Sequence, residues 1–243
     1  MGRDYEAEKN KRIEFIRKIV EDSGACGIVY GNSGGKDCTL VGILCKFACD
    51  DTLGLIMPCV AKSNYTDDFR DAMNLAEQFG IDTRAIELTS ADEAIKREIR
   101  KNTAITEAAA VNIAPRLRMA TLYAVAATEN RLVAGTGNRS ENYMGYFTKW
   151  GDGAYDFNPI ADLTATEVYE FLDYLGVKGR IMEKPPSGGL YDGQTDEKEM
   201  GVTYESIDVF LLTGECAPKD METITRHHNA TKHKRTPPRA YGG

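Results

Sequence analysis

Residues 31–38, GNSGGKDC, combine small residues with a lysine and an acid in a loop that could bind an anion. The apolar run at residues 26–31 before it is typical of a buried strand, and the apolar stretch at about residues 39–49 after it is typical of a helix. Small residues let backbone N–H groups turn toward an anion, and a helix N-terminus adds about half a positive charge. We therefore expect a phosphate group to bind here.

Two common phosphate loops do not fit these residues. The P-loop of GTPases and kinases requires Ser or Thr directly after its Gly-Lys pair, but Asp37 follows Lys36, and Tyr30 stands where the loop's first Gly is needed. The GxGxxG pattern of dinucleotide-binding proteins fails at Ser33. The Ser-Gly-Gly-x-Asp-Ser loop of the ATP pyrophosphatases, which cleave ATP between the α- and β-phosphates, is similar to this one, with Cys38 in place of the last Ser.

The elements that must position this loop alternate between strands and helices. This pattern predicts an α/β fold, a Rossmann-like doubly wound parallel sheet with helices on both faces, in a single domain over residues 1–243. Capping boxes are expected to open helices at residues 90–93 and at residues 164–167. The predicted strands are 26–31, 52–60, 82–88 and 132–136, and the predicted helices are 4–22, 39–49, 67–79, one long or broken helix within 103–130, and one ending near 175.

Composition excludes several classes of protein. A formal net charge of −7 argues against a general nucleic-acid binder and against a membrane-surface protein. No apolar run approaches the roughly 18 residues of a membrane span, and the charged first residues do not resemble a signal peptide, so we expect a cytoplasmic protein. The six cysteines include no CxxC pair, which disfavours a zinc site and a disulfide scaffold and favours buried, reduced thiols.

Five further segments, in order along the chain, resemble the ammonia-dependent NAD synthetases. Each is similar in residue types and spacing to a segment of that family: 112–119 (NIAPRLRM), 135–141 (GTGNRSE), 147–156 (FTKWGDGAYD), 185–190 with 194–197 (PPSGGL and QTDE), and 233–235 (HKR).

The resemblance implies a reaction and its substrates. The nicotinate carboxylate of deamido-NAD attacks the α-phosphorus of ATP, and ammonia then captures the acyl-adenylate to give NAD, AMP and pyrophosphate. Asp37 and Glu141 are implied ligands of Mg²⁺, although an acid near a helix N-terminus also has a plain capping role. The implied ATP-binding residues are Gly31, Asn32, Ser33, Gly34, Gly35, Lys36, Asp37, Cys38, Thr136 and Ser187, and the implied deamido-NAD-binding residues are Arg116, Lys149, Asp156, His233 and Lys234.

The resemblance also implies a homodimer and free ammonia as nitrogen donor, since these segments leave no room for a glutaminase domain; a separate glutaminase partner stays open. Residues 184–201, rich in Gly and Pro, are expected to form a mobile loop over the active site. Residues 223–243 contain no acid and form a basic C-terminal segment.

Three positions depart from the family pattern. Cys38 is a poorer hydrogen-bond donor than Ser, so phosphate contact would pass to backbone N–H groups or to Thr39. Pro115 is expected to kink a helix before Arg116. Ala165 stands where the family often has Lys, and whether another cation such as Lys36 compensates is left open by the sequence. Two rival functions therefore remain: a catalytically impaired nucleotide-binding sensor, and a different ATP pyrophosphatase.

Overall fold

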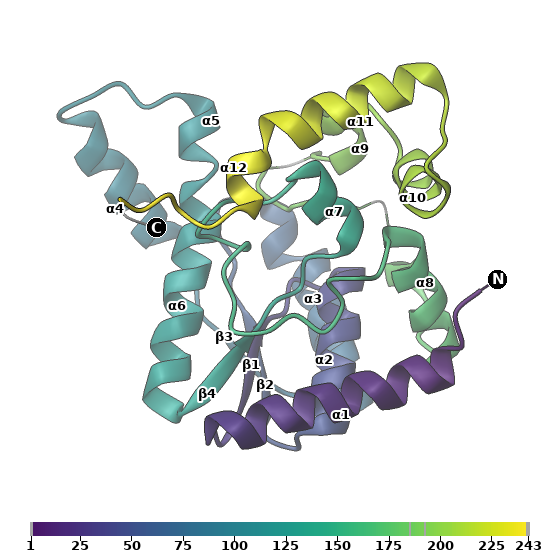
Figure 1. Ribbon diagram of the computed structural model, residues 1–243. Coiled ribbons are helices and arrows are strands. Elements are labelled where there is room, and N and C mark those ends of the chain that lie inside the picture. The colour runs from purple at the N-terminus through teal and green to yellow at the C-terminus, as the bar shows by residue number, and fades with distance from the viewer. Residues whose placement is uncertain (1, 185, 192, 242–243) are drawn as a thin grey trace.

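A four-stranded parallel sheet lies at the centre of the computed structural model, which describes residues 2–184, 186–191 and 193–241 (Figure 1). Positions 185 and 192 of the predicted loop, and positions 242 and 243 of the predicted basic segment, lie outside the described residues. The α/β fold with a parallel sheet is therefore confirmed. The strand order is β3-β2-β1-β4, with β1 at Gly27–Gly31, β2 at Thr52–Ile56, β3 at Asp82–Ala85 and β4 at Arg131–Ala134.

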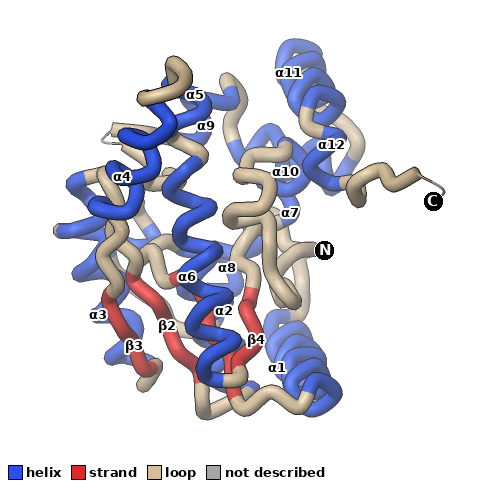
Figure 2. The backbone as a smooth tube through the Cα atoms, turned by 90° about the vertical axis from the view of Figure 1, so that its left-hand side faces the viewer, coloured by secondary structure: helices blue, strands red, loops and turns tan. Residues whose placement is uncertain are grey.

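Helices cover both faces of the sheet, because successive side chains of a strand point to opposite faces. Ile28 of β1 belongs to an apolar cluster that covers one face, and its neighbour Val29 belongs to a second cluster on the other face. Figure 2 shows the helices packed around the sheet. The helices whose side chains join the first cluster are α1 (Tyr5–Ser23), α2 (Lys36–Ala48), α3 (Asp67–Phe79) and α8 (Ala165–Tyr174); α6 (Ile113–Glu129) joins the second cluster, and α4 (Thr89–Arg100) packs against α6.

The remaining helices are short or follow the sheet in the chain. In Figure 1, α7, α9, α11 and α12 lie above the sheet, beyond the carboxyl ends of its strands. A third apolar cluster, which includes Met144, Ala165, Met200, Tyr204 and Ile224, joins the five helices α7, α8, α9, α10 and α11. The helices not yet given are α5 (Glu107–Ala110), α7 (Arg139–Met144), α9 (Asp196–Met200), α10 (Tyr204–Thr213), α11 (Pro218–Ala230) and α12 (Lys232–Arg235), with 3₁₀ turns η1 (Lys62–Tyr65) and η2 (Arg180–Met182).

Three local predictions are wrong. The capping box at residues 90–93 does not form, because α4 begins at Thr89, whose N–H donates to the Glu87 carboxylate over 2.7 Å. Pro115 does not interrupt a helix before Arg116, since it lies in the first turn of α6, where its missing N–H needs no partner. The strand predicted at residues 52–60 is too long. β2 ends at Ile56, two residues before Pro58, which cannot donate to a sheet ladder. The capping box at Thr164, in contrast, is confirmed.

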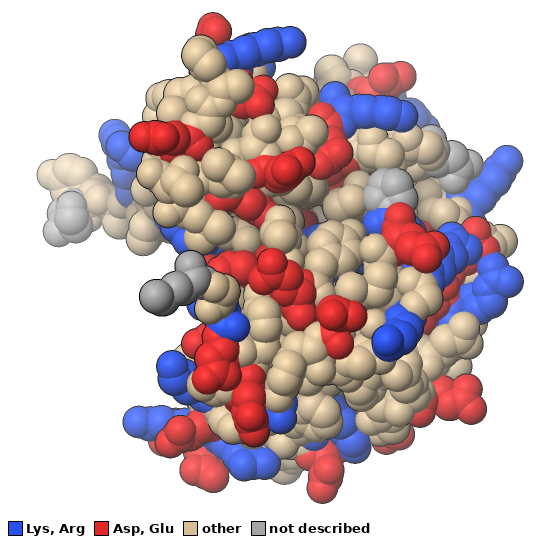
Figure 3. All heavy atoms as spheres, turned by 90° about the vertical axis from the view of Figure 1, so that its right-hand side faces the viewer, with Lys and Arg blue, Asp and Glu red and all other residues tan. Residues whose placement is uncertain are grey.

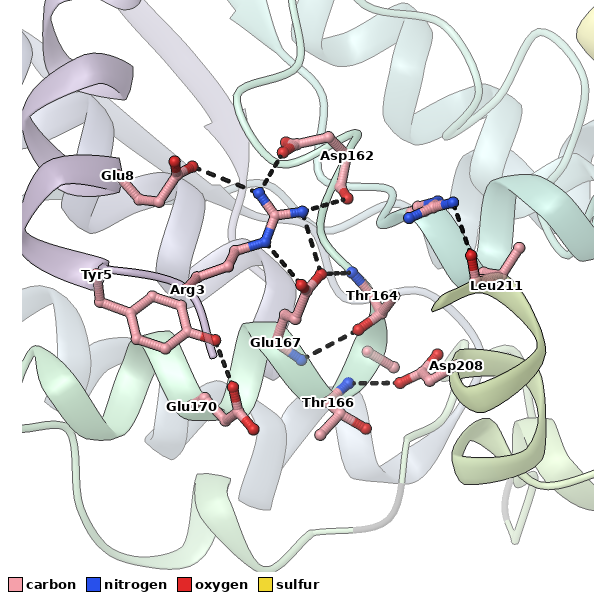
Figure 4. A network of polar contacts seen from close by, with 12 residues as sticks. Arg3, Tyr5, Glu8, Asp162, Thr164, Thr166, Glu167, Glu170, Asp208 and Leu211 are labelled. Carbon is pink, nitrogen blue, oxygen red and sulfur yellow. Dashed lines mark hydrogen bonds and ion pairs between the residues drawn. The ribbon is translucent and has the colours of Figure 1, made fainter. Parts of the chain in front are cut away.

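A polar network fixes the start of α8 (Figure 4). The Arg3 Nε donates to Glu167 Oε1 over 2.6 Å, and Glu167 Oε2 in turn accepts the backbone N–H of Thr164 over 2.8 Å. Asp208 of α10 accepts the N–H of Thr166 over 2.7 Å and also the hydroxyl of Ser140 on α7. Through these bonds, the N-terminal arm, α7 and α10 are all tied to one helix end.

The surface and the thiols bear on two further expectations. None of the described helices is long and apolar enough to cross a bilayer. Figure 3 shows carboxylate side chains across the face that carries α8 and α10, as the negative net charge leads one to expect. All six cysteines are free, and Cys38, Cys45 and Cys59 are buried, but Cys26 is exposed, so the expectation of buried thiols is wrong for that residue.

Candidate functional site

The candidate site lies where the strand order of the sheet reverses. The chain proceeds from β1 outward to β2 and β3, and then returns to place β4 on the other side of β1, with Tyr30 paired to Ala134. Loops that leave adjacent parallel strands on opposite sides of such a reversal diverge and leave a crevice at the carboxyl edge, where doubly wound proteins bind ligands. Residues 31–38 and residues 135–141 are the loops that leave β1 and β4, and both were predicted to contribute to the site.

The first of these loops is held in shape by its own side chains. Gly34 has a φ of +71°, and a Cβ atom there would lie 2.3 Å from the Asp68 carbonyl oxygen, so only glycine fits. Asn32 is buried; its Oδ1 accepts the Gly34 N–H over 3.3 Å, and its Nδ2 donates to the Ala72 carbonyl over 3.2 Å. Gly35 is the N-cap of α2 and makes no side-chain cap. The loop is therefore fixed against α3 while the N-terminus of α2 stays free of a side-chain cap.

Asn138 connects the two candidate metal ligands. Its Nδ2 donates to Asp37 Oδ1 over 3.0 Å, and its backbone N–H donates to Glu141 Oε2 over 3.0 Å. Asn138 is fully buried and forms a reciprocal capping box with Glu141 at the start of α7. The structure thus brings Asp37 and Glu141 together, as predicted. Sequence reasoning missed Asn138, although an Asn three residues before a Glu is the capping-box spacing that could have identified it.

Lys36 is buried beside these acids, and its ammonium contacts Asp37. Its Nζ lies 2.5 Å from Asp37 Oδ2, and 5.6 Å and 5.7 Å from the ring centroids of Tyr169 and Tyr204. Burial by itself lowers the pKa of Lys36, but the charges of Asp37 and Glu141 raise it to about 12. Lys36 is therefore a protonated cation at neutral pH. The two tyrosines were not predicted, because they come from α8 and α10, far away in the chain.

The carboxylates of Asp37 and Glu141 are suited to a magnesium ion. Burial, followed by the charge of Asp37, raises the pKa of Glu141 well above its usual range, and the charge of Lys36 opposes that shift only in part. Within the described part of the chain, no group of three or more His, Cys, Asp or Glu residues could hold a metal by itself. Two carboxylates are nevertheless what Mg²⁺ commonly takes from a protein, since substrate phosphates and water complete its shell.

Cys38 lies inside the loop, turned away from solvent. Its thiol is buried and contacts the Ser33 hydroxyl at 3.3 Å and the Gly35 carbonyl at 3.1 Å. The Thr39 hydroxyl, the alternative phosphate donor expected from sequence, also donates to the Gly35 carbonyl, over 2.8 Å. Backbone N–H groups at the start of α2 thus stay the donors best suited to an anion.

Most of the predicted deamido-NAD-binding residues form a second group. The Arg116 Nε donates to the Lys149 carbonyl over 3.3 Å, and the Lys149 Nζ donates to the His233 carbonyl over 2.8 Å. The Lys234 Nζ donates to the carbonyls of Gly145 and Phe147, over 2.7 and 2.6 Å. The basic segment is therefore packed along the loop that follows α7, and the ammonium of Lys234 is engaged with that loop's backbone.

Three predicted residues lie apart from these contacts. Asp156 accepts the Val133 N–H over 2.7 Å and the Tyr123 hydroxyl over 3.1 Å, at the edge of β4. Ser187 is exposed, and its hydroxyl accepts the Gly189 N–H over 3.2 Å. Thr136 is half-buried in the loop after β4. Their roles as ATP or substrate contacts stay predictions.

The parallel sheet, with a glycine-rich loop and paired carboxylates at its point of strand reversal, defines a doubly wound α/β protein with a site suited to a phosphorylated ligand. The family model described as NAD synthase matches residues 8–238. The chain therefore belongs to the NAD synthase family. It is 42% identical over 238 residues, 97% of each chain, to an NH(3)-dependent NAD(+) synthetase from Carboxydothermus hydrogenoformans.

Solved structures of related proteins share the fold over nearly the whole chain. A structure of an NMN synthetase from Francisella tularensis is 37% identical, with a TM-score of 0.93 over 99% of this chain and 100% of its own. An NH3-dependent NAD synthetase from Campylobacter jejuni is 30% identical, with a TM-score of 0.80 over 98% of this chain and 99% of its own.

Burial of Cys38 leads to a prediction about thiol reactivity. Burial raises the pKa of the Cys38 thiol, so very little thiolate, the reactive form, is present at neutral pH. We expect iodoacetamide at pH 7.5 to alkylate the exposed Cys26 at least about tenfold faster than Cys38, as measured by peptide mass spectrometry. In denaturant the two rates should converge. Faster labelling of Cys38 in the folded protein would contradict this burial.

Proposed function

We propose that this protein catalyses the ATP-dependent amidation of deamido-NAD to NAD with ammonia, releasing AMP and pyrophosphate. The observation that carries the proposal is the 42% sequence identity, over 97% of each chain, to an NH(3)-dependent NAD(+) synthetase. The arrangement of Asp37, Glu141 and the loop at residues 31–38 supports it, because a reaction that joins two anions must first neutralise phosphate charge.

Two groups of residues bind the two substrates. Backbone N–H groups at Gly35 and the start of α2 bind the triphosphate, and Arg116, Lys149 and the basic segment bind the dinucleotide. The nicotinate carboxylate oxygen attacks the α-phosphorus as the bond to the β-phosphate breaks. Ammonia then attacks the acyl carbon, AMP leaves with the former carboxylate oxygen, and the nitrogen loses a proton. Holding both substrates in line supplies much of the rate, since it converts a bimolecular step into one within the complex.

Asp37 and Glu141 would hold Mg²⁺, which stabilises the negative charge that develops on pyrophosphate. The support is the donor set, two hard carboxylates that Asn138 holds close together. Asn138 orients both acids, so it acts as a positioning residue. The cytoplasm stays the location predicted from composition.

A second candidate substrate is nicotinate mononucleotide. The close fit to an NMN synthetase structure, with a TM-score of 0.93, favours it. The chemistry at the nicotinate carboxylate would be the same for both substrates, and only contacts with the adenylate half of the dinucleotide distinguish them. Relative kcat/KM for the two acceptors therefore decides between them.

Phosphorus NMR tests the reaction directly. With ATP, Mg²⁺ and ammonium, we expect AMP and pyrophosphate only when deamido-NAD or nicotinate mononucleotide is added, together with an equal amount of amidated product. Glu141→Gln should lower kcat by about 100-fold or more, because it removes a charge beside the phosphates.

Glu129→Gln is the matched control. Glu129 pairs with Arg84 and precedes β4, at the opposite end of the strand from the site, so kcat should be unchanged. Formation of ADP and phosphate would contradict the proposal. Saturable ATP binding with no product would instead favour the nucleotide-binding sensor.

We also propose that residues 184–201 close over the site. Gly188 N–H donates to Asp196 Oδ1 over 3.0 Å, and Asp196 Oδ2 accepts the Tyr204 hydroxyl over 3.0 Å, which links this loop to a ring beside Lys36. Tyr191 is exposed on the loop. Chymotrypsin cleavage after Tyr191 should slow when ATP and deamido-NAD are added together, while cleavage after the exposed Tyr241 should not. An unchanged rate at Tyr191 would count against closure.

Finally, we propose a homodimer. The support is the family resemblance together with exposed aromatic side chains beside the predicted dinucleotide-binding residues: Trp150 is 59% exposed next to Lys149, and Tyr155 is 40% exposed next to Asp156. Such aromatic side chains are enriched at interfaces between subunits. Sedimentation velocity at micromolar concentration should give the mass of two chains, and a single-chain mass at that concentration would refute the dimer.

A further inference from the structure

Lys36 is the only buried lysine in the part of the chain that the structure describes. Burying an ammonium is costly, and its position adds a second cost, because it is the first residue of α2, where the helix dipole disfavours a positive charge. Neither folding of the loop nor capping of the helix needs a cation here. The presence of Lys36 therefore requires negatively charged groups nearby, whose attraction offsets both unfavourable effects.

Four side chains converge on the ammonium of Lys36. Asp37 holds Nζ at 2.5 Å, and Glu141 on α7 acts on it through its charge. The rings of Tyr169 on α8 and Tyr204 on α10 face it at 5.6 and 5.7 Å, a distance at which an aromatic face attracts a cation. These side chains thus surround a positive charge, and they come from parts of the chain that meet only in the fold.

The ammonium of Lys36 is a single positive charge among three acids. It offsets one of the two carboxylates that face each other through Asn138, and the carboxylate of Asp196, which the Tyr204 hydroxyl contacts, also acts on Lys36. The ammonium is bonded to the same Asp37 carboxylate that would bind a metal ion. A metal ion arriving at Asp37 would thus displace Nζ, and the flexible four-carbon stem of lysine allows it to swing to another anion nearby.

We propose that Lys36 is a resident cation of the phosphate site, which partly offsets the charges of Asp37 and Glu141 before nucleotide binds and transfers to the triphosphate of ATP when nucleotide and metal enter. This role rests on the proposed function, since it presupposes that a nucleoside triphosphate binds at residues 31–38. In this role, Lys36 gives the site a permanent positive charge that does not depend on the metal concentration. Lys36 would then contact the substrate.

The proposal predicts two effects of opposite sign for Lys36→Met, which keeps the length of the side chain and removes its charge. ATP without metal, measured by titration calorimetry in EDTA, should bind about tenfold more weakly or worse, because a charged contact is lost. Mn²⁺ without nucleotide, measured by electron paramagnetic resonance, should bind at least about threefold more tightly, because nothing competes for Asp37. Lys36→Arg should keep ATP affinity within about threefold.

Lys96→Met is the matched control, because Lys96 also pairs with a buried acid, Asp92, but lies on α4, which packs on the other face of the sheet. It should change neither affinity. An unchanged ATP affinity in Lys36→Met, or an Mn²⁺ affinity that stays equal or falls, overturns the proposal, and a fall in both is what a merely structural lysine would give. Failure of the wild-type protein to bind ATP would instead overturn the proposed function, so the two failures are distinguishable.

Discussion

The reversal of strand order between β1 and β4 is the constraint on which the site depends. Parallel strands end at one edge, and only the reversal leaves room there, because connections on the two sides of it run away from each other. Residues 31–38 and 135–141 flank that space, and Asn138 joins them through Asp37. The topology of the sheet therefore brings Asp37 and Glu141 close together, although about a hundred residues separate them in the chain.

Asp37 and Glu141 are half-buried carboxylates placed close together, and much of the surrounding structure responds to their charge. Lys36 supplies one cation, and two tyrosine rings surround that cation. The helices that carry those rings are fixed in turn by polar contacts, since Asp208 of α10 bonds to the first turn of α8 and to Ser140, next to Glu141. The network in Figure 4 thus ties the N-terminal arm to the helix that faces the site.

Residues 223–235 of the basic C-terminal segment, within α11 and α12, pack against the rest of the fold. Lys234 bonds to two carbonyls of the loop after α7, and the His233 carbonyl accepts from Lys149. Its positive charge is thereby held near residues expected to bind a dinucleotide, in a protein whose net charge is otherwise negative.

The sequence alone determined the alternation of strands and helices, the family, and the glycine-rich loop and two acids that meet at the edge of the sheet, because each depends on short-range patterns or on motifs in a fixed order. It misplaced local boundaries, as at Ser90 and Pro115, where the final start of a helix decides what a residue does. Only the tertiary structure revealed that Asn138, Tyr169 and Tyr204 meet around Asp37 and Lys36. No spacing encodes such a meeting, since it depends on how separate helices pack against one another at the edge of the sheet.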